Sequence, residues 1–208
     1  MSDSNVKIAN IALTKMGASR ITAFTENTEE AKAVNAVYND ILDEVLSSHP
    51  WSFAQKRVVL ATLSDTPIDT EDGMTTIYAR PSDLIMVNMI SSGTAQVKLE
   101  AEGILSDTAD LKMIYTYRNT DPITYFPAFT QALATRLASE ICMALTQSAT
   151  KASAFLEDYE NLKLPRAKSQ DSKQGTPRNI LQNEWTNARL AGTGYLSAVT
   201  GAETWHPA

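Results

Sequence analysis

The amino-acid sequence predicts an α+β fold: a helical bundle formed by both halves of the chain, an inserted antiparallel β region and an extended C-terminal arm. Apolar residues recur at three- and four-residue steps near the N-terminus and again after Pro127, as they do on packed helices. Between these stretches, apolar and polar residues alternate as in half-buried strands. We therefore expect a discontinuous bundle over residues 1–50 and 119–170, the β region over 51–118 and the arm over 171–208.

The first predicted helix spans residues 5–16. Ile8, Ile11 and Met16 follow helical spacing, and Gly17 stands where a helix commonly ends. A second, longer helix is expected to start near Asn27.

Asn27 and Glu30 have the spacing of a capping box at the start of that second helix. Apolar residues then follow at three- and four-residue steps. The helix should end near Ser48, because the residue before Pro50 is pushed out of helical geometry.

The middle of the chain favours strands. Alternation is clearest in residues 111–117, where every odd-numbered position is apolar or aromatic. Residues 65–73 and 107–110 carry the residue types of turns. The predicted strands are residues 57–63, 76–80, 84–90, 111–117 and, more weakly, 96–99.

Helices are expected again after Pro127. Large apolar side chains step by four from Phe129 to Leu145 with alanines beside them, which predicts a central helix of the bundle. A last helix should run over residues 151–164 until Pro165 ends or kinks it. Its inward side chains are expected to be Phe155, Tyr159 and Leu162, and its outward ones Glu157, Asp158 and Glu160.

The predicted arm has neither a helical nor a strand period, yet it holds two of the three tryptophans. Trp and Tyr are common anchors of protein interfaces, and Arg is often enriched beside them. We expect the arm to dock on a partner, although a solvated tail with incidental aromatic residues is the simpler alternative. The candidate docking residues are Trp185, Tyr195, Trp205, Arg178 and Arg189.

Composition limits the classes of function. The formal net charge of −6 and the lack of a concentrated basic run argue against nucleic acid as a tightly bound partner. We find neither a signal peptide nor an apolar run long enough to span a bilayer, which predicts folding in a reducing cytoplasm. The single cysteine, Cys142, excludes an internal disulfide and is expected to be a core thiol.

The sequence offers little for catalysis. It has two histidines, no metal-ligand spacing, no phosphate-binding glycine loop and no nucleophile elbow, so we expect no catalytic or metal residue and no cofactor. Adjacent carboxylates at Glu29–Glu30 and Asp43–Glu44 leave a glycoside hydrolase as an alternative, since such enzymes need two carboxylates across a cleft. Adjacent charges on a helix more often form a solvated face.

The most distinctive local motif lies between the second helix and the first strand. It contains His49, Pro50, Trp51 and Phe53, which we call the hinge motif. Pro50 should stop the helix, Trp51 should fold back on the bundle, and Phe53 should lead into the sheet. A structural hinge is the expected role, and a ligand-binding role for His49 would be unusual.

At this motif the chain resembles the head-to-tail connector adaptors of short-tailed bacteriophages, the group that includes tail tubular protein A. The resemblance covers roughly residues 5–170, and the order and spacing of its segments are more telling than any one of them. The most specific segment is Val45-Leu-Ser-Ser-His-Pro-Trp-Ser-Phe-Ala54. The other segments are Asn10-Ile-Ala-Leu-Thr-Lys-Met-Gly-Ala18, Glu30-Ala-Lys-Ala-Val34 with Tyr38, Asp83-Leu84, Glu102-Gly-Ile-Leu-Ser-Asp107, Leu111 to Tyr117 and Phe129 to Thr146.

The resemblance implies a virion structural protein, assembled in the host cytoplasm, that forms a ring beneath the portal protein. Such rings usually contain twelve copies, receive the tail nozzle or tube, and help to retain the packaged DNA, which passes through without specific binding. No membrane is involved. The arm would grip the portal. Two alternatives stay open: a tail-associated hydrolase acting on cell-envelope polysaccharide, and a non-viral interaction module with the same bundle.

Overall fold

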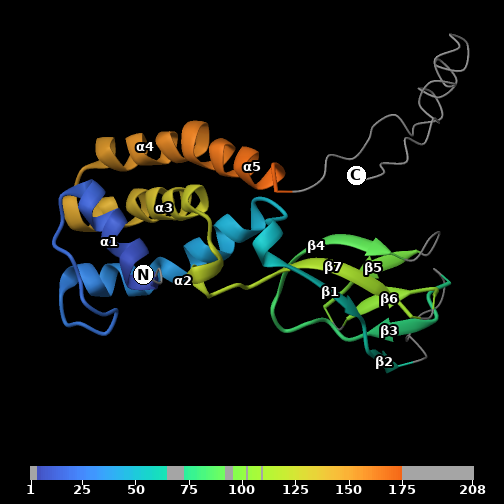
Figure 1. Cartoon of the computed structure of the whole chain (residues 1–208). Coiled ribbons are helices and arrows are strands. Elements are labelled where there is room, and N and C mark those ends of the chain that lie inside the picture. The colour runs from blue at the N-terminus through green and yellow to red at the C-terminus, as the bar shows by residue number, and fades with distance from the viewer. Residues whose placement is uncertain (1–3, 65–72, 92–95, 102, 109, 175–208) are drawn as a thin grey trace, which may run out of the picture. The chain divides into compact units, whose positions relative to one another are not determined.

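Two helices, seven strands and three further helices follow one another in the part of the chain that the structure describes (Figure 1). The structure is a computed structural model that describes residues 4–64, 73–91, 96–101, 103–108 and 110–174. The chain up to Gln174 forms one compact unit. Helices and antiparallel sheets occupy separate stretches of sequence, so the predicted α+β class is confirmed.

Helix α1 (Asn5–Met16) and helix α2 (Glu29–Ser47) open the chain. Ser4 caps α1, and Gly17 ends it with a left-handed φ of 80°, as expected. The start of α2 differs from the prediction by one residue. Thr28, rather than Asn27, is the cap, because Thr28 has extended backbone angles and its Oγ1 accepts the Ala31 N–H at 3.3 Å.

Helix α3 (Pro127–Thr146) is the central helix, as its spacing predicted. It packs against α1, α2 and α4, and its first half also contacts the last helix of the described chain (Figure 1). Phe129, Leu133 and Leu137 are fully buried, and the alanines beside them let the neighbouring helices approach closely. Cys142 is fully buried here, which confirms the predicted core thiol.

The predicted last helix is longer than expected. It comprises α4 (Ala149–Asp158), a π turn η3 (Tyr159–Lys163) and α5 (Leu164–Ser172), so Pro165 does not end it. Pro165 is the second residue of α5 and directly follows the π turn. The π turn holds one residue more than an α turn, which shifts the buried face by one position.

Two expectations for this helix change as a result. Tyr159 is buried as predicted, but Leu162 is 53% exposed instead of facing inward. The buried face continues at Ala167 and Asp171, one residue later than a constant helical period would place it. The helical part therefore extends past the expected boundary at residue 170.

Seven strands form two antiparallel sheets in the described part of the β region. The first sheet has the order β1-β7-β4 and the second the order β2-β3-β6-β5. The strands are β1 (Gln55–Val59), β2 (Thr62–Ser64), β3 (Thr76–Tyr78), β4 (Leu84–Ser91), β5 (Val97–Leu99), β6 (Ile104–Ser106) and β7 (Lys112–Tyr117).

The structure corrects the strand prediction in two places. The run predicted as one strand over 57–63 is divided at Leu60 and Ala61, and its two halves join different sheets. Strand β6 was not predicted, because all three of its residues are buried and show no alternation. Gly103 precedes β6 where a Cβ would lie 2.6 Å from the Tyr78 carbonyl oxygen, so a side chain would clash there.

Two hydrophobic cores result from this arrangement. The larger contains the buried faces of α1, α2 and α3 together with Trp51 and Tyr125. The smaller lies in the β region and includes Tyr78, Leu111 and Met113. The hinge motif lies where the chain passes from the first core to the second.

Candidate functional site

An aromatic cluster surrounds the hinge motif. Trp51 is fully buried, and its indole N–H donates to the Val45 carbonyl at 2.9 Å. Its ring meets Phe129 of α3 edge-on, with the ring centroids 5.0 Å apart. Phe53 packs on the same Phe129 ring at 4.7 Å and on Tyr125 at 5.3 Å. The motif is thereby fixed to the start of the central helix.

Phe53 leads into the sheet as expected, because the first strand begins two residues later at Gln55. Its side chain packs in the aromatic cluster of the helical core. Pro50 is exposed, and its carbonyl accepts a hydrogen bond from the Gln55 side chain at 2.8 Å. Trp51 folds back onto the helices, as predicted.

A buried carboxylate from the end of α5 holds the same motif. Asp171 is 6% exposed, and its oxygens accept from the Ser52 hydroxyl at 2.6 Å and from the Ser52 backbone N–H at 3.1 Å. One Asp171 oxygen also lies 3.2 Å from His49 Nε2. The Ser52 hydroxyl lies 3.2 Å from the Gln174 side-chain oxygen. We call these four residues the Asp171 cluster.

The Asp171 cluster gives His49 a structural partner. It joins the end of the last described helix to the segment that leads into the β region. Sequence reasoning missed Asp171 and Ser52, because 119 positions separate them and neither carries a local signal. The chemistry of the cluster is that of a satisfied buried carboxylate.

The chain segment that leaves the β region packs against the segment that enters it. The Asn119 side chain donates to the Phe53 carbonyl at 3.2 Å, and the Tyr125 hydroxyl donates to the Asn119 carbonyl at 2.5 Å. Burial raises the pKa of Tyr125 above its ordinary value, so the hydroxyl stays protonated and able to donate even at alkaline pH. Arg118 forms an ion pair with Asp43 of α2. Both connections to the β region are thus fastened to the helices.

The carboxylates considered for hydrolysis are mostly engaged elsewhere. Asp43 pairs with Arg118, and Glu44 accepts from Arg136 Nε at 2.8 Å. Glu29 lies 3.0 Å from the Lys32 ammonium. In the described residues, no group of three or more His, Cys, Asp or Glu side chains could hold a metal ion.

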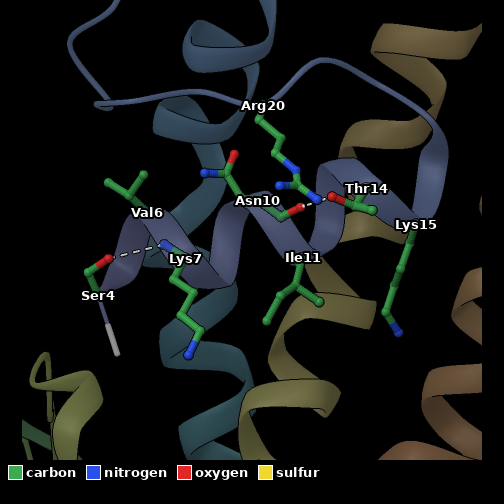
Figure 2. Close-up of a pocket in the computed structure, with 8 residues that line it drawn as sticks. All are labelled: Ser4, Val6, Lys7, Asn10, Ile11, Thr14, Lys15 and Arg20. Carbon is green, nitrogen blue, oxygen red and sulfur yellow. Dashed lines mark hydrogen bonds between the residues drawn. The ribbon is translucent and has the colours of Figure 1, made fainter. Parts of the chain in front are cut away.

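A second candidate site is an open groove of about 580 Å³ along α1 (Figure 2). Lys7, Ile11 and Lys15 succeed one another at four-residue steps and project to one side of the helix, while Arg20 reaches back over Thr14 from the following loop. The floor is partly apolar because Val6 and Ile11 are half-buried. We call this surface the α1 groove.

Lys15 is the most buried cation of the α1 groove. Its ammonium donates to the Thr135 hydroxyl of α3 at 2.6 Å. Burial lowers the pKa of Lys15, nearby Lys163 lowers it further, and Asp158 acts in the opposite sense. Arg20 forms no ion pair within the part of the chain that the structure describes. The groove therefore offers positive charge beside apolar surface, a pattern that sequence analysis overlooked although the spacing of Lys7, Ile11 and Lys15 was visible.

The arm residues predicted to dock on a partner, Trp185, Tyr195, Trp205, Arg178 and Arg189, lie outside the described residues.

Comparison with models of known protein families and with curated protein sequences finds no match. Among the described helices, none is long and apolar enough to cross a membrane. The features that bear on function are thus the hinge motif, the Asp171 cluster and the exposed surfaces.

Proposed function

We propose that this chain is a head-to-tail adaptor of a short-tailed bacteriophage, a non-catalytic virion protein that forms a ring between the portal and the tail nozzle. The helices would form the bundle that makes the ring, and the residues after Gln174 would be the arm that docks on the portal. The family resemblance of the segment from Val45 to Ala54 motivates this function.

The Asp171 cluster is the observation that carries the proposal. A docking arm transmits force to its own subunit only if its base is fixed. Here the last described helix is tied to Ser52 by a buried carboxylate, and Gln174 lies beside the same serine. The arm would thus start from a point that is joined to the helices and to the entry of the β region.

Exposed apolar side chains on the β region support a contact with the nozzle or a neighbouring copy. Val59 lies on the edge strand β1 and Met89 on the opposite edge strand β4, and both are exposed. Leu63 and Leu99 are exposed on the second sheet. Sheet edges that carry apolar residues are suited to pairing with another chain.

Two further observations support the proposal: the net charge of the chain, and the ion pairs of the carboxylates that were considered for hydrolysis. A net charge of −6 would let packaged DNA pass through the ring without sticking. The polysaccharide hydrolase is not favoured, because Asp43, Glu44 and Glu29 each have a cationic partner.

Two truncations test the arm. A chain ending at Gln174 keeps the Asp171 cluster, so we expect unchanged thermal unfolding but no binding to purified portal protein. A chain ending at Gln170 loses Asp171 as well, so it should also unfold at a lower temperature. The full-length Trp185→Ala, Tyr195→Ala, Trp205→Ala triple variant serves as a control of equal length and should bind the portal weakly. Full portal binding by the chain that ends at Gln174 would overturn the arm proposal.

A further inference from the structure

The α1 groove has a complementary surface on the same chain. The outer face of the α4 helix and its π turn carries Leu156, which is 38% exposed, with Glu157 and Glu160 exposed beside it. Glu160 lies about one helical turn from both Leu156 and Glu157, so it is a neighbour of each on the helix surface. We call this surface the acidic patch.

Some of the charges on the two surfaces have no ion-pair partner among the described residues. Arg20 of the groove has no ion pair among the described residues, and neither do Glu157 and Glu160 of the acidic patch. Each surface also places apolar side chains among its charges: Val6 and Ile11 in the groove, Leu156 in the patch. The groove is cationic and concave (Figure 2). The patch is anionic and lies on the exposed, convex face of a helix.

We infer that the α1 groove of one copy binds the acidic patch of a second copy of this chain. The contact would join two different surfaces, so it leaves one groove and one patch open on every dimer and adds further copies until the assembly closes. Opposite charge would set the register of the contact, and the apolar side chains would be removed from water. The inference deepens the proposed ring and rests on it, by naming the surfaces that hold neighbours together.

A second copy is the occupant that the observations favour. The chain as a whole is acidic, with a net charge of −6, so approaching copies repel each other unless a basic surface faces an acidic one. The groove is such a basic surface, and the same chain supplies the matching patch in equal number.

Charge-reversing substitutions on each of the two surfaces of the full-length chain test the inference. One variant carries Lys7→Glu and Arg20→Glu in the groove, and the other carries Glu157→Lys and Glu160→Lys in the patch. Sedimentation velocity should show that the wild-type chain forms assemblies larger than a dimer, which dissociate as salt is raised. Each variant alone should associate about 10-fold more weakly or worse. Lys112→Glu, an exposed charge on β7, is the matched control and should assemble like the wild type.

An equal mixture of the two charge-reversed variants gives the decisive result. Every groove in the mixture finds a patch of opposite charge, so assembly should return only when both variants are present. This outcome also excludes misfolding as the cause of the loss. A wild-type chain that stays monomeric, a groove variant that assembles normally, or a mixture that stays dissociated would each overturn the inference. None of these results bears on whether the protein is present in virions, which is the separate test of the proposed function.

Discussion

The Asp171 carboxylate joins two segments of the chain through hydrogen bonds to a charged group, which are stronger than those between neutral groups. Replacing it with alanine removes the acceptor for both donors of Ser52 and the partner of His49. We expect Asp171→Ala to lower the free energy of unfolding by about 1–3 kcal/mol in chemical denaturation.

Asp40→Ala is the control for this substitution, because Asp40 is exposed on α2. It should change stability by less than about 0.5 kcal/mol. Equal stability of the two variants would mean that the Asp171 cluster contributes nothing to the fold.

Asp83 makes the stability of the β region depend on acid pH. Burial raises the pKa of Asp83, but hydrogen bonds from Lys56 and Tyr115 outweigh burial and hold the pKa below its ordinary value of 3.8. The folded protein therefore binds the Asp83 proton less readily than the unfolded chain does. The resulting stabilisation is fully present at pH values above the ordinary pKa, and it is lost as the pH falls through the lowered pKa of the folded state.

The matching prediction compares the wild type with Asp83→Asn. The wild type should be the more stable protein near neutral pH, and its advantage should shrink as the pH is lowered from about 5 to about 2. Urea denaturation at several pH values measures the difference. A difference that stays constant over this range would contradict the role given to the Asp83 carboxylate.

At the scale of elements, the phase of the last helix decides whether Asp171 reaches Ser52. Inserting one alanine between Arg166 and Ala167 would rotate everything beyond it by about 100°. Asp171 would leave its partners, and Ala167 would leave the core. We expect at least the destabilisation of Asp171→Ala, measured by thermal unfolding.

An alanine inserted after Gln174 is the control for that experiment. It follows all four residues of the Asp171 cluster, so their positions are kept and stability should be nearly unchanged. Similar unfolding temperatures for the two insertions would show that the phase of the helix does not matter.

Helices whose period is regular were predictable from the sequence, and so was the strand with clear alternation. The spacing of Phe129, Leu133 and Leu137 placed α3 at the centre of the core. In residues 111–117, Leu111, Met113 and Tyr115 are buried as expected, but the even-numbered Thr116 is buried as well. Leu162 was misplaced because a π turn adds a residue that a constant period does not contain. Strand β6 was missed because burial of all its side chains removes the alternation.

Of the candidate site, the hinge motif could be predicted from the sequence but the Asp171 cluster could not. The hinge motif is a local pattern of a helix stop and aromatic residues, so the sequence shows it. The Asp171 cluster forms by tertiary contact between Ser52 and a residue 119 positions away, and such contacts leave no local trace.

At the scale of the whole molecule, we propose three binding surfaces on one chain: an arm for the portal, exposed sheet edges for the nozzle or a neighbour, and the groove and patch for ring contacts. The arm and the groove–patch contact have separate tests, so failure of one leaves the other standing. The claim common to all three is that the protein is a structural part of a virion.

Quantitative mass spectrometry of purified phage particles tests that claim most directly, by comparing the copy number of this protein with that of the portal. The account predicts that the two are present in a near-equal ratio. Absence of the protein from the particle, or presence at a small fraction of the portal's copy number, would contradict it.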